Sequence, residues 1–200
     1  MSKVYKLILI LLSTIIMTGC VSEPKVKIEE KVYTQVGMWY LNKSREVFIS
    51  GDVLSDGDSI TAIGSIPAVN YSRDVFIPVN TLVTIVDNST YDTITFKLQN
   101  KIIALVNKKA YTGLSTADFV KKMFTPTPVD LSGFTESEQK FIAKGEVELY
   151  MSKEAVIVSR GYPPIHRTPN LEDNTWRYWE ARFNSRNYIF DDNKLIRLQD

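Results

Sequence analysis

One residue that could act as a general base is the only histidine in this chain, His166. It follows two prolines, and Glu172 and Asp173 come shortly after it. A catalytic base needs an oriented partner within hydrogen-bond reach, and the sequence shows no serine motif of the nucleophile-elbow type. We therefore predict that His166 is a loop residue or a polar contact with a partner, and that the protein is not an enzyme.

A second group with possible chemistry is a cluster of three aspartates around Gly57, namely Asp52, Asp56 and Asp58. Calcium loops of the EF-hand kind place oxygen ligands at alternate positions and need a glutamate near their end. Leu54 and Ile63 occupy two of the ligand positions, so we interpret the segment as a solvated hairpin turn. One histidine and one cysteine are too few for a usual zinc site. We predict no metal and no cofactor.

The only cysteine, Cys20, ends a short apolar segment. Lys3 and Lys6 precede an apolar run, which Ser13–Thr14 interrupts. Spanning a bilayer takes about 20 apolar residues, so residues 1–20 are predicted to be a secretory signal peptide. The Gly-Cys pair at its end resembles the lipobox of bacterial lipoproteins, which implies acyl chains such as palmitate on Cys20 and attachment to a membrane. A signal peptide cut elsewhere, or an uncleaved anchor, is the alternative.

The composition of the chain argues against further classes of function. The net charge of +1 and a pI near 7.7 show no basic excess, so we predict no nucleic-acid partner. No cysteine follows Cys20, which leaves no intramolecular disulfide and no thiol nucleophile. The 44% apolar and 24% charged content is typical of globular domains.

The first half of the mature chain is predicted to be β-rich. Residues 21–31 are polar and are interpreted as a flexible tether. Alternating or apolar runs then predict short strands at residues 46–54, 59–66, 82–86, 93–98 and 102–106. We expect residues 32–124 to form a small barrel or sandwich, with an SH3-like fold as our interpretation. A helix over residues 117–124, capped by Thr116, ends this domain, and the Pro-rich residues 125–128 are predicted to be a hinge.

The second half, residues 129–200, is predicted to be α+β. Thr135 and Glu138 form a capping box for a helix that runs to about Lys144. Ser152 caps a second helix, Lys153–Arg160. Three antiparallel strands follow at about residues 174–182, 186–190 and 194–198.

The most aromatic stretch lies on the first of these strands. Trp176 and Tyr178 share one face of the strand, whereas Trp179 and Phe183 share the other. We expect Trp176 to be a core residue, together with Phe190. Core packing and a partner surface both remain open for the rest of the stretch. The candidate partner surface consists of loop and strand residues, namely Tyr162, His166, Arg167, Tyr178 and Trp179.

Four short motifs follow one another in this half: Met151–Val156, Gly161–Pro164, Trp176–Trp179 and Phe190–Ile196. Together they resemble the SmpA/OmlA/BamE-like lipoprotein domain over about residues 145–200. The resemblance implies two helices packed on a three-stranded antiparallel sheet. Members of that family include a small component of the outer-membrane β-barrel assembly machine. Tyr150 stands where the family commonly has a glycine, and the extra β-rich domain argues against this being that component, so no partner-contact residues are carried over.

These features together predict a non-enzymatic envelope lipoprotein that binds or scaffolds an envelope protein. No aspartate follows Cys20, because Val21 and Ser22 stand there. Resemblance to other lipoproteins then implies the periplasmic face of the outer membrane. A module that binds cell-wall glycan and an envelope hydrolase are the alternative functions. The sequence makes no prediction of oligomeric state.

Overall fold

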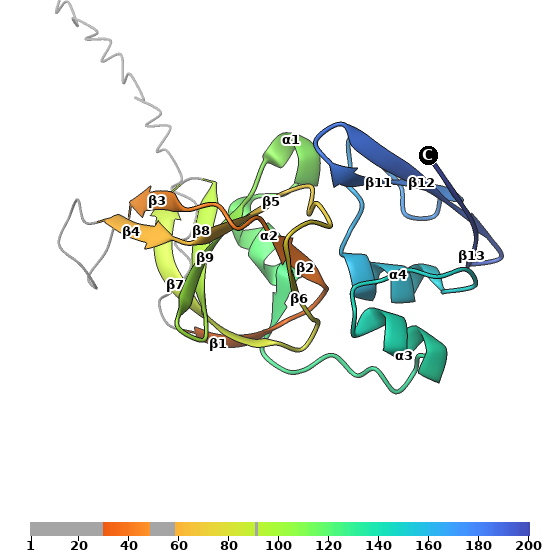
Figure 1. Cartoon of the computed structure of the whole chain (residues 1–200), viewed down its shortest axis with the longest axis horizontal. Helices are drawn as coiled ribbons and strands as arrows, with labels where there is room; N and C mark the ends of the chain where they lie inside the picture. Colours follow the sequence, from red (N-terminus) through yellow and green to blue (C-terminus); the bar gives the residue numbers. More distant parts are fainter. Residues whose placement is uncertain (1–29, 49–58, 91) are drawn as a thin grey trace, which may run out of the picture.

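The computed structural model describes residues 30–48, 59–90 and 92–200. The predicted signal peptide, Cys20, most of the predicted tether and the aspartates around Gly57 lie outside these residues. The protein is a mixed α+β molecule, rich in sheet, with four helices in the described part. The β-rich half and the helical half lie side by side (Figure 1). No helix in the described ranges is long and apolar enough to cross a membrane.

The main sheet of the first half has six strands, and neighbouring strands are antiparallel except for β5 and β9, which are parallel. In spatial order the strands are β10 (Phe124–Thr125), β1 (Glu30–Thr34), β7 (Leu82–Thr90), β8 (Thr93–Leu98), β9 (Lys101–Val106) and β5 (Gly64–Pro67). The sheet is open, with β10 and β5 at its edges. Since β1 begins at Glu30, the last two residues of the predicted tether are strand.

Two small antiparallel pairs complete this half. β2 (Met38–Tyr40) pairs with β6 (Val75–Ile77), and β3 (Arg45–Phe48) pairs with β4 (Ser59–Ala62). The β3–β4 pairing confirms that these runs meet as antiparallel strands, although the predicted turn lies outside the described residues. The predicted strand over residues 59–66 is divided into β4 and β5, which belong to different sheets.

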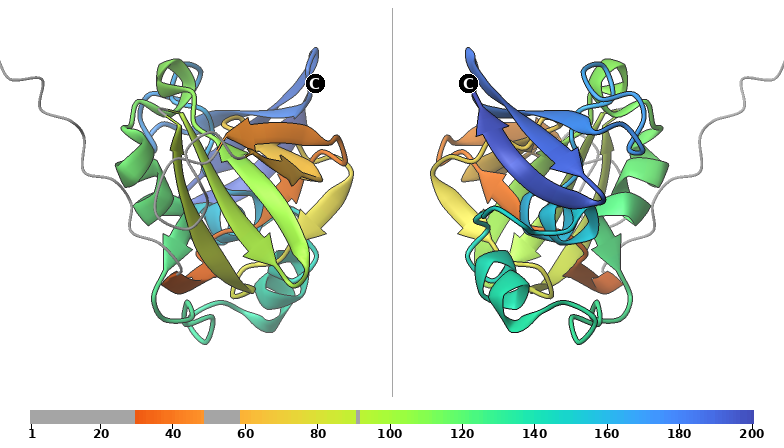
Figure 2. Two further views of the ribbon diagram at one scale, coloured as in Figure 1. Left: turned by 90° about the vertical axis from the view of Figure 1, so that its left-hand side faces the viewer. Right: turned by 90° about the vertical axis from the view of Figure 1, so that its right-hand side faces the viewer.

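Burial explains why these runs form strands. The first four residues of β8 are all buried, as are Ile103, Ala104 and Leu105 of β9, so both faces of this region are covered. The helix α2 (Thr116–Met123) contributes Phe119, Val120 and Met123 to the same core and lies beside the sheet (Figure 2). The short helix α1 (Lys109–Thr112), which the sequence pattern did not predict, precedes it.

The predicted start of α2 was one residue too late. Ser115, not Thr116, is the N-cap, because its side chain accepts the Asp118 amide. The helix ends at Met123, and Phe124 already has extended backbone.

The helical half matches the predicted order of elements. Helices α3 (Glu136–Ile142) and α4 (Lys153–Arg160) are capped by Thr135 and Ser152, and the Thr135–Glu138 capping box is present. Strands β11 (Thr175–Ala181), β12 (Asn184–Asp191) and β13 (Lys194–Gln199) form an antiparallel sheet above the helices in Figure 1. The predicted extension of α3 to Lys144 was wrong, because the helix ends at Ile142 and Ala143 is its C-cap.

The core of this half lies between the helices and the sheet. Trp176 is 1% exposed and Phe190 is 2% exposed, and their ring centroids are 4.7 Å apart. Both predicted core residues are therefore confirmed. The Lys153 ammonium lies over both rings and donates to the Leu171 and Glu172 carbonyls, which accounts for this cation at the edge of the core.

Hydrogen bonds to the backbone join the two halves. The Gly37 amide donates to the Val158 carbonyl at 2.9 Å. The Asn80 side chain makes two hydrogen bonds with the backbone of Val129, and Thr125 belongs to β10 in the main sheet. The Pro-rich residues 125–128 therefore begin in strand β10 and end next to Val129, which the Asn80 side chain holds in place. The division into two domains stays a prediction.

Candidate binding pocket at the junction of the two halves

A pocket of about 180 Å³ lies where the two halves meet. One wall comes from the residues after β5, one from α1 and α2, and one from the loop after α4. Most of the lining side chains are apolar or aromatic: Pro67, Ala68, Tyr111, Leu114, Phe119, Met123, Tyr162, Pro163, Pro164, Ile165, Pro169 and Leu171. The polar or charged lining residues are Asn70, Thr112, Lys122 and Thr168.

The loop after α4 is held in place at both of its ends. Gly161 has φ +80°, a conformation that side chains disfavour, and there the chain leaves the helix toward Pro163 and Pro164. The Ile165 amide donates to the Tyr111 carbonyl at 2.9 Å, which attaches the loop to α1. The Thr168 hydroxyl accepts the Arg177 amide at 2.9 Å, which attaches it to β11. The wall is therefore preformed.

The polar lining residues other than Lys122 are engaged in structural hydrogen bonds. Asn70 accepts the Trp39 amide and donates to the Gly37 and Arg160 carbonyls. The Thr112 hydroxyl donates to the Asn107 side chain at 2.6 Å. Their positions are fixed by the protein itself, so they shape the wall.

Lys122 differs from these residues. It is half-buried on α2, and its ammonium lies 3.7 Å from the centroid of the Tyr162 ring. Burial lowers the pKa of Lys122 and raises that of Tyr162. Within residues 30–48, 59–90 and 92–200 Lys122 forms no ion pair, and it is the only charged side chain there that lines the pocket. Among the side chains that line the pocket, Lys122 is therefore the charged group that lacks a carboxylate partner within the described residues.

The five residues predicted as a partner surface lie in different environments. Tyr162 lines the pocket, and His166 packs its ring against Tyr111, with centroids 4.6 Å apart. Arg167 is exposed. Tyr178 is 2% exposed and donates its hydroxyl to the Gly161 carbonyl, so its assignment to a surface was wrong. Its side chain faces the helices, as the alternation along β11 requires.

Trp179 lies on the opposite face of β11 from Tyr178 and is half-buried. Its indole nitrogen is buried and has no hydrogen-bond partner among the described residues. Phe183, which follows β11, is 88% exposed. Of the five predicted surface residues, the structure therefore places Tyr162 in the pocket and His166 against a residue that lines it, and it moves Tyr178 into the core.

His166 is exposed on the loop that follows α4. Burial, followed by the charge of Arg167, lowers the pKa of His166. No hydrogen bond joins it to a carboxylate or a hydroxyl in the described structure, where its ring contacts Tyr111. Nor do the described residues contain a group of three or more histidine, cysteine or carboxylate side chains placed to hold a metal ion.

Arg160 lies at a second contact between the two halves, which the sequence pattern did not reveal. It is 4% exposed at the end of α4, and its guanidinium lies 5.3 Å from the ring centroids of both Trp39 and Tyr178. One nitrogen reaches Glu180 at 3.3 Å, and Glu180 also accepts the Ser72 hydroxyl. Arg160 therefore joins aromatic residues of both halves. No local signal marks such a role, because its partners lie far away in the chain.

Comparisons of this chain with protein-family models, with curated proteins and with solved structures found no match.

Proposed function

We propose that this protein is a bacterial cell-envelope lipoprotein with a non-enzymatic binding or scaffolding role. The observation that carries the binding role is the preformed junction pocket, whose walls come from both halves. Its lining is mainly apolar and holds one lysine that forms no ion pair within the described residues, a combination suited to recognition. The histidine beside it has no oriented acid–base partner within the described residues, so the pocket supports binding better than hydrolysis.

The proposal includes where the protein lies in the cell envelope. Residues 1–20 have the pattern of a lipoprotein signal peptide that ends at Cys20, and acyl chains on that cysteine would hold the protein at the membrane. We place it on the periplasmic face of the outer membrane, with an envelope protein as its partner.

The fold of the second half supports a BamE-like assignment to a limited degree. Two helices against three antiparallel strands are what the resemblance implies for this region, and α3, α4 and β11–β13 have this arrangement. The SH3-like assignment of residues 32–124 has less support, because the main sheet is open and its edge strand β5 is parallel to β9. Fold similarity of this kind does not assign a function.

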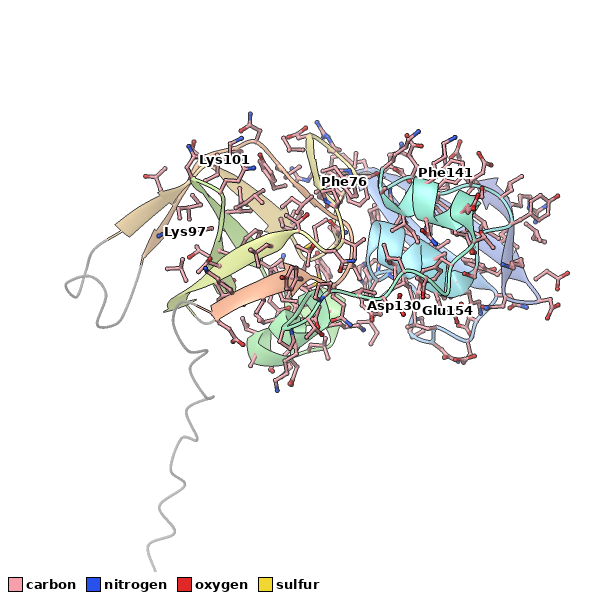
Figure 3. The ribbon with its side chains drawn as sticks, turned by 90° about the horizontal axis from the view of Figure 1, so that it is seen from below. Phe76, Lys97, Lys101, Asp130, Phe141 and Glu154 are labelled. Atoms are coloured by element: carbon pink, nitrogen blue, oxygen red, sulfur yellow. The ribbon has the colours of Figure 1, made fainter. Side chains whose placement is uncertain are left out.

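Site-specific photo-crosslinking in intact cells tests the binding role. A photoreactive residue at Arg167, in the exposed part of the pocket loop, is compared with one at Lys97 on β8. Lys97 is exposed and lies at the end of the β-rich half that faces away from α3 and α4 (Figure 3). We expect a defined envelope protein to be captured from position 167 and not from position 97. Equal capture from both positions, or capture of cell-wall glycan alone, would contradict the proposal.

The anchor is tested separately with the Cys20→Ser variant and an alkyne analogue of palmitate. We expect the label on the wild type alone, together with loss of the variant from the outer-membrane fraction. Unlabelled wild-type protein in the cytoplasm would rule out the lipoprotein assignment.

A further inference from the structure

We infer that the junction pocket binds a carboxylate that carries one apolar group of about the size of an amino-acid side chain, with the carboxylate on Lys122. This inference rests on the proposed binding role of the pocket and adds the chemical class of the ligand. The apolar group would lie among Leu114, Phe119, Met123 and Ile165, which line the same pocket.

The volume of the pocket limits the apolar group. Pockets for drug-sized ligands have volumes of roughly 300–1,000 Å³, whereas this pocket measures about 180 Å³. An apolar cavity of about 150 Å³ is large enough to take up benzene. The space therefore suits a single ring or one branched aliphatic group.

The position of Lys122 sets the charge of the ligand. Phe119, Lys122 and Met123 are spaced three and four residues apart, so one face of α2 presents both the ammonium and its apolar neighbours. An ammonium taken partly out of water is costly unless a counter-charge is near. The Tyr162 ring at 3.7 Å supplies part of this stabilisation through its π face. A carboxylate would supply the rest through a charge-assisted hydrogen bond.

The lining also favours a monoanion over a phosphate group. Phosphate sites commonly use arginine forks or several backbone amides at a helix start. In the described structure the pocket has no arginine in its lining, and its one cation is a lysine. Because Pro163 and Pro164 hold one wall rigid, little ordering is needed before the ligand enters.

The test uses the full chain, purified in detergent, and two small probes of nearly the same size, one charged and one neutral. N-acetyl-L-phenylalanine carries the carboxylate, and N-acetyl-L-phenylalaninamide is its neutral counterpart. Binding is followed through amide chemical shifts of the pocket residues by NMR. We expect the acid to bind at least tenfold more tightly than the amide, with shifts at Phe119 and Ile165. Equal affinities, or no saturable binding by the acid, would overturn the inference.

Variants assign the preference to the lysine. Lys122→Met should lower the affinity for the acid about tenfold and leave that for the amide unchanged. Lys122→Arg, which keeps the charge, should retain the preference. Lys97→Met, on an exposed position of β8 that does not line the pocket, is the matched control and should change neither affinity. An unchanged acid affinity in a folded Lys122→Met protein would also refute the role of Lys122.

A third probe identifies the source of the carboxylate. A pentapeptide that ends in phenylalanine is compared with its C-terminally amidated form. If the free peptide binds with the same charge preference, the ligand is a chain end, and if the small acid alone binds, it is a free metabolite. Both results agree with the inference. Failure of all acids would leave the crosslinking and lipidation tests of the proposed function unaffected, because those do not depend on ligand charge.

Discussion

Glu138 connects three elements through a single carboxylate. One oxygen accepts the Thr135 amide at 3.0 Å, and the other accepts the Ser152 amide at 2.8 Å and lies 3.5 Å from the Lys194 ammonium. The starts of α3 and α4 and the end of the β12–β13 turn therefore meet at this residue. Burial alone would raise its pKa, but the hydrogen bonds from Ser152 and Thr135 outweigh it and lower the pKa from 4.5 to about 2.

This pKa shift predicts how stability depends on pH. The folded protein holds the Glu138 proton less tightly than the unfolded chain, so the stabilisation is complete above pH 4.5 and is lost as the pH falls toward about 2. Glu138→Gln should lower the free energy of unfolding by about 1–2 kcal/mol near pH 7, and the difference from wild type should shrink over that window. Urea unfolding at several pH values measures both.

Glu136→Gln is the control for Glu138, because Glu136 is exposed in the same helical turn. A surface change of this kind should stay within about 0.5 kcal/mol of wild type. A Glu138→Gln protein whose deficit does not vary with pH would show that the charge of Glu138 is not responsible.

At the scale of an element, the start of α2 depends on Ser115. Its hydroxyl oxygen accepts the Asp118 amide at 3.1 Å, while Thr116 is already helical and accepts from the Asn107 side chain. Ser115→Ala should cost about 1 kcal/mol of stability because a helix N–H loses its acceptor. Chemical denaturation of Ser115→Ala and Thr116→Ala gives the comparison.

Ser137→Ala, at an exposed position in the first turn of α3, is the matched control and should be near neutral. A larger loss from Thr116→Ala than from Ser115→Ala would place the cap at Thr116, as the sequence pattern had predicted. The cap bears on function because α2 carries Lys122.

At the scale of the whole molecule, Gly37 allows a close approach of the two halves. A Cβ at this position would collide with the Ser159 carbonyl oxygen of α4, which is backbone and cannot turn aside. Gly37→Ala should therefore destabilise the protein by about 1–3 kcal/mol through overpacking. Thermal unfolding, with limited proteolysis of residues 126–134, reports both stability and opening of the junction.

Gly133→Ala serves as the control, since a Cβ there would meet no atom within 4 Å. It should leave the melting temperature nearly unchanged. If Gly37→Ala melted at the same temperature as Gly133→Ala, the close contact between the halves would not exist in solution.

Features that depend on a few neighbouring residues were predictable from the chain alone. The Thr135–Glu138 capping box and the Ser152 cap both occur as their local patterns indicate. The same holds for the extent of β8. In each case the hydrogen bond or the side-chain alternation involves residues close in sequence, so residue type and spacing carry the information.

Features that depend on distant neighbours came from the folded molecule. A period of two places Tyr178 and Trp179 on opposite faces of a strand, but it does not tell which face is covered. Likewise, no local pattern brings β5 beside β9, or Pro67, Lys122 and Tyr162 around one pocket. Burial and pocket walls arise from contacts between segments far apart in the chain, and these contacts form only in the folded molecule.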